Sequence, residues 1–234
     1  MPDVPVTWLG HASFRIDTPG GKRIYIDPWL SNPKCPEGEH DPERVDVIAL
    51  THGHDDHVGE TVELAKRFAP RVIAMVELRG WLTGQGVDED MSSAMNKGGS
   101  VDADGTRFTM TDARHSSSCQ DGSYVGEAAG YVVTFENGTT IYVAGDTCVF
   151  GDMQLIGRIY RPDVAILPIG GHYTMDPPEA AVALELLHAQ TCIPCHYGTF
   201  GLLTGTPDEL RENLRQAGVD AEVLSPEPGE TVTV

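Results

Sequence analysis

The sequence predicts an α+β protein in which two β-sheets pack face to face between outer helices, giving a four-layer αββα sandwich. Two observations predict this class. Each half of the chain opens with short β-type runs and continues with strands and helices that alternate. The 234 residues contain no low-complexity linker, and they show no internal repeat with a period of about 20–50 residues. We therefore expect residues 1–234 to form a single domain.

The first half begins with a meander of short strands, separated by turns at Gly10 and at residues 19–21. The apolar run Val45–Leu50 is typical of a strand that is buried on both faces. We expect a helix from about Val58 that ends before Pro70. The other expected strands of this half are Val6–Leu9, Ser13–Asp17, Arg23–Ile26 and Arg71–Val76, and a short helix follows at Glu77–Thr83.

The second half returns to strands at Arg107–Asp112 and Gly130–Gly145. The dipeptide Asn137-Gly138 divides the longer run, and between two β-type segments it is a strong hairpin signal. The alternation that follows consists of helices at Met153–Tyr160, Pro178–His188 and Pro207–Ala217 and of strands at Val164–Ile169, Cys192–Cys195 and Glu230–Val234.

The composition narrows the partners and the compartment. The chain carries 35 acidic and 16 basic residues, a formal charge of -19, so we expect no nucleic-acid partner. No apolar run approaches the roughly 20 residues needed to cross a bilayer, and the first residues lack the basic and apolar regions of a secretory signal. Five scattered cysteines fit a reducing compartment better than a disulfide framework. These features predict a cytoplasmic protein that does not insert in membranes.

A dense histidine and aspartate motif follows directly after Leu50. In an extended segment residues two apart point to the same side, so His52 and His54 can reach one metal ion. The chain then turns into a helix, which directs Asp56 and His57 toward a second point. A helix N-cap explains one aspartate but not three histidines. The spacing therefore predicts a metal site.

Three further candidate ligands, His115, Asp146 and His196, stand where other expected strands meet loops. Loops on a rigid scaffold are the usual place for functional groups. A lone histidine at a strand end is more often an ordinary polar residue, but three such residues together with the first motif favour a metal centre. Imidazole and carboxylate ligands suit Zn²⁺, Mn²⁺, Ni²⁺ or Fe, and no thiolate ligand is evident to select among them.

With these motifs in place, the sequence resembles the metallo-β-lactamase superfamily. Within it, the chain is similar to the UPF0173 metal-dependent hydrolases, which resemble lactonase-like members. The resemblance runs nearly from end to end. Besides the motifs above, it includes Trp8-Leu9-Gly10-His11-Ala12-Ser13, Asp27-Pro28-Trp29, Pro168-Ile169-Gly170-Gly171-His172-Tyr173-Thr174-Met175 and His196-Tyr197-Gly198-Thr199-Phe200.

The resemblance implies the metallo-β-lactamase αββα fold and an assignment of ligands. Two divalent ions are expected, Zn²⁺ first, with Mn²⁺, Ni²⁺ or Fe as alternatives. All seven ligand positions hold the residue type that the family uses. His52, His54 and His115 would bind the first ion, Asp56, His57 and His196 the second, and Asp146 would bridge both.

Three residues outside this set are candidates for the surroundings of the metals. Asp27 ends the third strand and can accept a hydrogen bond from a ligand histidine. His11 lies in the turn between the first two strands, an edge that is near the metals in the resembling proteins. His172 follows two glycines, so its loop can approach a substrate closely. Ordinary turn or loop roles are the alternatives for all three.

The segment Cys192-Ile193-Pro194-Cys195-His196 matches the pattern of covalent haem attachment. We reject haem because its attachment requires an exported chain and because the metal site needs His196. The two cysteines are expected to pack as small apolar residues. Cys148 and Cys119 are close in sequence to two of the candidate ligands.

These residues predict a metal-dependent hydrolase. The expected nucleophile is a hydroxide that bridges two divalent metals, while the metals polarise the substrate and stabilise developing charge. Asp56 and Asp146 would hold the water, and His172 would assist the oxyanion or the leaving group. The expected substrate is a small-molecule ester, lactone or phosphodiester.

Two other functional classes stay open. The same fold hosts di-iron and mononuclear iron oxidoreductases, although this chain has no appended flavin-binding domain and carries the full dinuclear set. A metal-binding sensor module without turnover is the second alternative. A homo-oligomer is compatible with the sequence.

Overall fold

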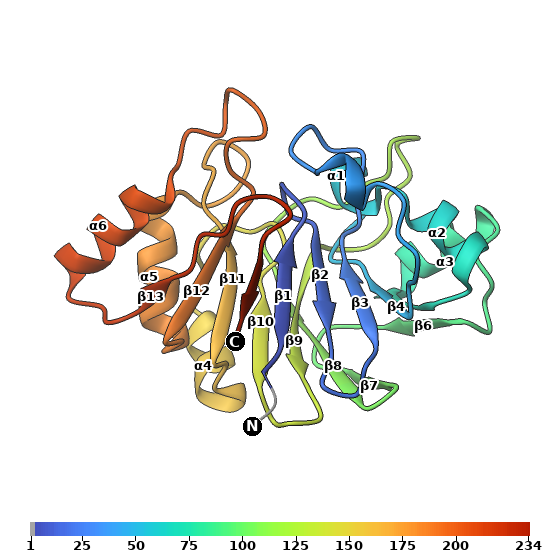
Figure 1. Cartoon of the computed structure of the whole chain (residues 1–234), viewed down its shortest axis with the longest axis horizontal. Coiled ribbons are helices and arrows are strands. Elements are labelled where there is room, and N and C mark those ends of the chain that lie inside the picture. Colours follow the sequence, from blue (N-terminus) through green and yellow to red (C-terminus); the bar gives the residue numbers. More distant parts are fainter. Residues whose placement is uncertain (1–2) are drawn as a thin grey trace.

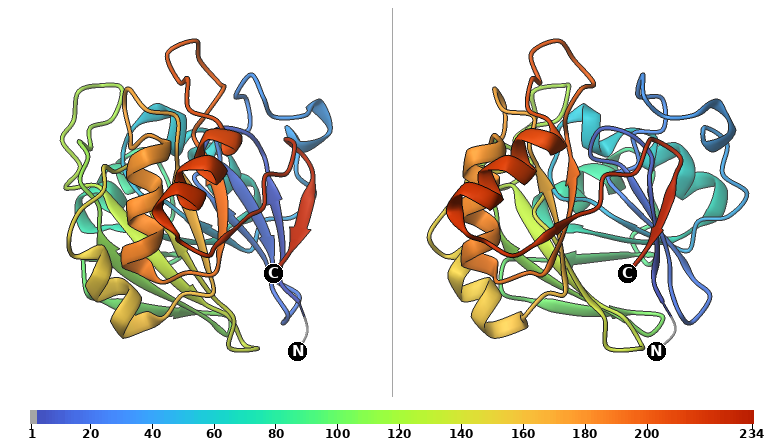
Figure 2. Two further views of the ribbon diagram at one scale, coloured as in Figure 1. Left: turned by 90° about the vertical axis from the view of Figure 1, so that its left-hand side faces the viewer. Right: turned by 60° about the vertical axis from the view of Figure 1, so that its left-hand side comes forward.

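The computed structural model describes residues 3–234. In this part of the chain two seven-stranded sheets lie face to face, and helices cover both outer faces (Figure 1). The helices of the C-terminal half lie together on one side of the molecule in the turned views of Figure 2. The predicted order of layers, helices–sheet–sheet–helices, is therefore confirmed. Met1 and Pro2, part of the segment in which we expect no signal sequence, lie outside the described residues.

The first sheet takes its strands from the N-terminal half and from the end of the chain. Across the sheet they are β14 (Thr231–Thr233), β1 (Pro5–Trp8), β2 (Phe14–Asp17), β3 (Arg23–Ile26), β4 (Val47–Ala49), β5 (Arg71–Met75) and β6 (Ser92–Met95). The first three strands in the chain form the predicted antiparallel meander. From β3 to β6 all neighbours are parallel. The helices of this half are α1 (Asp55–Val58), α2 (Thr61–Phe68) and α3 (Val76–Gly84), and a 3-10 turn lies at Glu37–Glu39.

The second sheet likewise has an antiparallel part, from β7 to β10, and a parallel part, from β10 to β13. Its strands are β13 (Glu222–Val223), β12 (Thr191–Cys195), β11 (Val164–Pro168), β10 (Thr140–Val143), β9 (Ala129–Thr134), β8 (Thr106–Asp112) and β7 (Ser100–Ala103). The Asn137-Gly138 turn joins β9 and β10 as an antiparallel hairpin, as predicted. The outer helices are α4 (Met153–Tyr160), α5 (Pro177–Leu187) and α6 (Pro207–Ala217).

The apolar core lies both between the sheets and beneath the outer helices. On β9 the side chains of Tyr131 and Val133 pack in the core between the sheets, whereas Val132 packs against the helices α4 to α6. A strand buried on both faces must be apolar at every position. This requirement explains why the central strands stand out in the sequence as continuous apolar runs.

The predicted helix near Val58 is wrong in its start and its continuity. α1 begins three residues earlier, at Asp55, and a break separates it from α2. At the break Gly59 has φ 43°, and a β-carbon there would lie 2.4 Å from the carbonyl oxygen of Pro28. The loop after β3 therefore packs directly on this backbone and leaves room only for glycine. Local periodicity cannot reveal such a contact.

The sequence does not predict the strands β6, β7 and β13. Each of them is the outermost strand of its sheet. An edge strand does not need two apolar faces, and in β7 the side chains of Ser100 and Asp102 are exposed. These segments therefore lack the periodic signal on which the other strands were predicted. Among the described residues, the helices are all too short or too polar to cross a bilayer.

Candidate metal centre

The candidate residues lie on loops at one edge of the two sheets. The strands β1, β3 and β4 run in one direction within the first sheet, and β8, β10 and β12 do so in the second. The carboxyl ends of parallel strands are a common place for binding sites. The residues that follow these strands are, in the same order, His11, Asp27, His52 to His57, His115, Asp146 and His196.

Backbone hydrogen bonds between the two sheets hold this edge together. The amide of His196 donates to the carbonyl of His11 at 2.8 Å, and the amide of Ala129 donates to the carbonyl of Thr51 at 3.0 Å. Each bond joins a loop of the first sheet to a segment of the second. The relative position of the candidate ligands is therefore set by how the two sheets dock.

The first group of side chains consists of His52, His54 and His115. One ligand nitrogen from each lies within 4.8 Å of the others. His52 Nε2 and His54 Nδ1 are 3.0 Å apart, so these two residues do converge on one point. His52 is buried, whereas His54 and His115 are partly exposed. Ser116 Oγ contacts His54 Nε2 at 3.3 Å.

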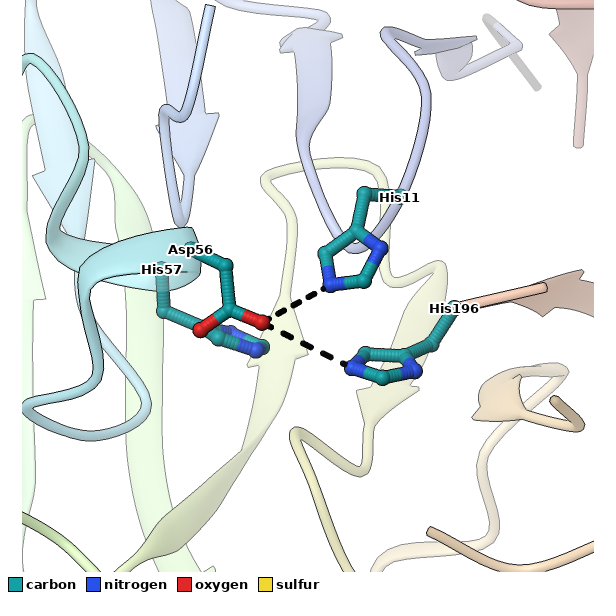
Figure 3. Close-up of side chains that lie close together, drawn as sticks. All are labelled: His11, Asp56, His57 and His196. Carbon is teal, nitrogen blue, oxygen red and sulfur yellow. Dashed lines mark hydrogen bonds and ion pairs between the residues drawn. The ribbon is translucent and has the colours of Figure 1, made fainter. Parts of the chain in front are cut away.

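The second group, shown in Figure 3, consists of His11, Asp56, His57 and His196. Its ligand atoms also lie within 4.8 Å of one another. Asp56 Oδ2 is 4.0 Å from His196 Nε2 and 3.0 Å from His11 Nε2. The three histidines are fully or almost fully buried, and the aspartate is partly exposed.

Asp146 lies between the two groups and is almost completely buried. Its carboxylate oxygens are 3.2 Å from His196 Nε2, 3.3 Å from His57 Nε2 and 3.6 Å from His115 Nε2. It also forms a compact set of candidate ligands with His52 and His57. A carboxylate in this position can contact cations on both sides.

Several buried ligand atoms in the cluster have no hydrogen-bond partner. They include His57 Nε2, Asp146 Oδ1 and His196 Nε2. Burial of a polar atom without a hydrogen bond costs about 1–3 kcal/mol, and here Asp146 offers the two imidazoles ion-pair contacts in place of hydrogen bonds. A divalent cation satisfies imidazole nitrogens and carboxylate oxygens together. The donor set of this cluster therefore fits metal ions.

His57 lies between two carboxylates, those of Asp146 and Asp27. Burial alone would lower the pKa of His57, but the carboxylates of Asp146 and Asp27 raise it well above its ordinary value. Burial would likewise raise the pKa of Asp146, whereas His57 and His196 hold it well below the usual range. Two buried carboxylates on either side of one imidazole therefore demand positive charge at this point.

The histidines of the first group are neutral at pH 7 because burial disfavours their charged form. Burial lowers the pKa of His52 well below its ordinary value, and it also lowers the pKa of His54 and of His115. Metal ions bind the neutral form of imidazole. These side chains are therefore already in the protonation state that a metal requires.

Asp27 lies behind the cluster and fixes the ring of His57. Its Oδ2 accepts a hydrogen bond from His57 Nδ1 at 2.7 Å, and its carboxylate also accepts from the amide and the hydroxyl of Thr51 at 2.8 and 2.6 Å. Because Nδ1 is held by Asp27, His57 presents Nε2 toward Asp146. A carboxylate that orients a ligand histidine in this way typically changes metal affinity by about 10–100-fold.

His11 lies closer to the cluster than a turn residue needs to be. Its ring is fully buried, with Nε2 3.0 Å from Asp56 Oδ2 and Nδ1 3.0 Å from Thr199 Oγ1. An ionised carboxylate can only accept, so Nε2 donates to Asp56 and Nδ1 accepts from Thr199. Burial lowers the pKa of His11 to about 4, which keeps the ring neutral. Burial would raise the pKa of Asp56, but the contacts with His11 and His57 hold it below its ordinary value.

Four of the candidate residues have a left-handed backbone conformation. The φ angles are 51° at His11, 46° at Asp27, 61° at His172 and 53° at His196. Non-glycine residues in this region are uncommon and tend to gather at functional sites, where the surrounding structure imposes them. The close approach of the loops, rather than local preference, therefore determines the direction of these side chains.

A cavity of about 270 Å³ opens over the cluster. Tyr173 lines it, and His172 does not. Instead His172 lines a neighbouring cavity with Gly170 and Asp176, and its ring packs edge-on against Tyr173. The chain doubles back here, since the amide of Tyr173 donates to the carbonyl of Gly171 at 2.7 Å. Tyr173 was not among the predicted site residues. An aromatic residue next to two glycines in a loop is the signal that could have indicated it.

The cysteines are all unpaired, and four of the five are buried. Cys192 and Cys195 pack within the cores on either side of β12, as expected for small apolar residues. Cys119 packs close to Gly53, where a β-carbon would lie 3.4 Å from its sulfur and 2.3 Å from Val125 Cγ2. None of the cysteines belongs to the candidate ligand groups among the described residues.

Comparison with known proteins identifies relatives of the whole chain. A family model described as a β-lactamase superfamily domain matches residues 22–197. A UPF0173 metal-dependent hydrolase from Roseiflexus castenholzii is 46% identical over 238 residues, covering 99% of this chain and 98% of that protein. Another from Koribacter versatilis is 48% identical over 230 residues, covering 97% and 96%.

A solved structure gives the same picture in three dimensions. Igni18, described as a metallo hydrolase from the hyperthermophilic archaeon Ignicoccus hospitalis, superimposes with a TM-score of 0.88. The two chains are 36% identical, and the match covers 100% of this chain and 99% of the other. Fold and sequence similarity therefore agree over the full length.

Proposed function

This chain belongs to the β-lactamase superfamily, among the UPF0173 metal-dependent hydrolases, and from this premise we propose that it hydrolyses a small-molecule ester, lactone or phosphodiester with two divalent metal ions. One observation carries the proposal. Seven imidazole and carboxylate side chains from both sheets converge around buried ligand atoms that have no protein partner.

We assign two ions to the two groups of side chains. His52, His54 and His115 would hold the first, Asp56, His57 and His196 would hold the second, and Asp146 would contact both. Zn²⁺ is our first expectation because nitrogen ligands predominate, with Mn²⁺, Ni²⁺ or Fe as alternatives. When bound, two such ions supply a water of lowered pKa and polarise the bond to be cleaved.

The residues of the chain can orient the reacting groups and accept a proton from them. His11 donates to Asp56 Oδ2 and so fixes the rotation of this carboxylate. Asp56 lines the cavity, where it can accept the proton of the attacking water. Ser116 also lines the cavity, and its hydroxyl can donate to the substrate. Asp27 and Thr51, by contrast, act from behind His57 and do not face the cavity.

Metal analysis of protein purified without chelators, followed by a substrate panel with the same metal restored, tests this proposal. We expect about two divalent ions per chain and hydrolysis of at least one ester, lactone or phosphodiester. The His52→Ala variant should bind less metal and lose activity, while the exposed His188→Gln variant should match the parent protein. A folded His52→Ala variant with full activity would contradict the proposal, as would oxygen consumption without any hydrolysis.

A further inference from the structure

We infer that the metal centre takes an uncharged acyl substrate, a carboxylic ester or lactone, whose aliphatic or aromatic group lies on an apolar rim formed by Tyr173, Phe200 and Leu202. This inference rests on the proposed function and narrows its substrate class. The three rim residues stand on two loops, residues 169–176 after β11 and residues 196–206 after β12. No residue of the rim belongs to the candidate ligands.

The floor of the cavity provides no cation besides the proposed metals. The residues that line it in the described part of the chain are His54, Asp56, His115, Ser116, Asp146, Tyr173 and His196, with no lysine or arginine. Sites for phosphoryl transfer bind the phosphate oxygens through arginine, lysine or metal ions, and here the cavity would offer the metals alone. The chain also carries a formal charge of -19, which repels anionic substrates at a distance. Both features favour a neutral substrate.

The rim is apolar and exposed. The exposed fractions are 53% for Tyr173, 41% for Phe200 and 53% for Leu202. These are three of the eight large apolar side chains exposed in residues 3–234, although the two loops are short. Large apolar side chains that gather beside a polar pocket commonly mark a binding surface.

The rim begins directly at the metal centre. The ring of Phe200 packs edge-on to His11 at 5.5 Å and lies 6.1 Å from the ring of Trp29. His11 in turn contacts Asp56 and lies 3.9 Å from the ring of His196. Only one ring therefore separates Phe200 from two candidate ligands. A substrate held at the metals would reach this apolar surface with its next few atoms.

The two loops form one continuous surface. The amide of Gly205 donates to the carbonyl of Gly170 at 3.3 Å. A β-carbon on Gly205 would lie 1.9 Å from the carbonyl oxygen of Ile169, so the backbones are in direct contact. The loop after β12 projects beyond the sheets at the end of the molecule away from the termini (Figure 1). The loops that carry Tyr173 and Leu202 therefore lie side by side.

The test measures binding separately from hydrolysis. Linear alkyl hydroxamic acids with four to eight carbons provide a metal-binding head group and an apolar tail of variable length. Their dissociation constants for the Zn²⁺-loaded protein are measured by calorimetry. Because the rim is only partly enclosed, we expect affinity to rise about twofold per methylene, below the roughly fourfold of full burial. Dibutyl phosphate should bind at least tenfold more weakly than the six-carbon hydroxamic acid.

Variants assign the effect to the rim. Tyr173→Ala and Phe200→Ala should each reduce the dependence on tail length, whereas Tyr173→Phe should retain it. The control is Ile159→Ala, a more exposed apolar residue on α4 with 62% exposure, which should leave every constant unchanged. Affinity independent of tail length, or equal dependence in the Tyr173→Ala variant, overturns the inference.

Hydrolysis of γ-lactones and of bis(4-nitrophenyl) phosphate is measured with the same preparations. It distinguishes a failure of the apolar rim from a failure of the proposed hydrolase function. If phosphodiesters are cleaved and tail length has no effect on binding, the apolar rim is wrong and the metal-dependent hydrolase stands. If the tail-length effect is present but no substrate is cleaved, the rim stands and the proposed function fails.

Discussion

The two sides of the metal cluster differ in how firmly the protein holds their side chains. On the side of His57 and His196 the imidazoles are buried, and Asp27 and His11 support the candidate ligands through short hydrogen bonds. On the side of His54 and His115 the rings are partly exposed, and the contact from Ser116 is a longer one at 3.3 Å. We call these the buried side and the open side.

The difference indicates that the two sides have different roles, tight metal binding on the buried side and substrate access on the open side. A ligand whose ring is fixed by a second hydrogen bond loses little freedom when it binds a metal, so the buried side should bind more tightly. His54, His115 and Ser116 of the open side line the cavity, together with Asp56, Asp146 and His196, and the more exposed rings of the open side leave more room for a substrate. Rigid support on one side and access on the other are what a hydrolytic centre requires.

The largest effect is expected where the two sides meet. Asp146→Asn removes the carboxylate that contacts His57, His115 and His196, so both sides should lose metal. We expect kcat/KM to fall at least about 1000-fold, equivalent to about 4 kcal/mol, and metal content to drop below one ion per chain. The exposed Asp104→Asn variant is the control. Retention of two ions by Asp146→Asn would contradict its position between the sites.

Asp27→Asn tests the support of the buried side. Asparagine tolerates the left-handed backbone at this position, but as a neutral amide it orients His57 less strongly than the carboxylate. One of the two ions should bind about 10–100-fold more weakly in a competition against a chelator. Ser116→Ala, the matched change on the open side, should alter affinity by less than threefold. Equal effects of the two variants would remove the distinction between the sides.

His11→Asn tests whether this residue acts through Asp56. Loss of a hydrogen bond to a charged group costs about 1.5–3 kcal/mol, so we expect at least a tenfold fall in kcat while two ions per chain are still bound. Thr199→Val, which removes the hydroxyl on the far side of the ring, should have a smaller effect. Complete loss of one ion in His11→Asn would instead make His11 a direct ligand.

The smallest effect concerns pH and the protein without metals. Burial lowers the pKa of four histidines in the folded state, namely His11, His52, His54 and His115. The unfolded chain therefore binds more protons as the pH falls below about 6.5, and stability declines. His57 acts in the opposite direction, because its raised pKa stabilises the folded state fully below about 6.5 and less as the pH rises through the folded value.

Because four groups oppose one, the melting temperature of the metal-free protein should fall by several degrees from pH 7 to pH 5. Differential scanning calorimetry in the presence of a chelator measures this change. The variant His52→Gln should show a shallower decline. A metal-free protein that is equally stable at both pH values would show that these rings are not neutral in the folded state.

The sequence predicted an element well where its apolar pattern and its end signals lie within the element or next to it. α4 and α6 have the predicted bounds, since each carries its apolar face and its end signals in adjacent residues. The hairpin at Asn137-Gly138 is likewise a local decision of the turn. The seven candidate ligands could be selected from the sequence because each follows a strand and because the motif at His52 is dense.

Contacts between distant segments decided the rest. The break at Gly59 depends on contact with the loop after β3, about thirty residues earlier in the chain. The edge strands form only because a neighbouring strand supplies their hydrogen bonds. The approach of His11 to Asp56 and the position of Tyr173 in the cavity wall depend on loop geometry at the edge where the sheets meet. The sequence by itself therefore determined which residues are available for the chemistry, because hydrophobic periodicity and residue type are local properties. Only the tertiary structure decided which of them meet, because side-chain direction at that edge is set by the docking of two sheets and by backbone conformations that no local preference favours.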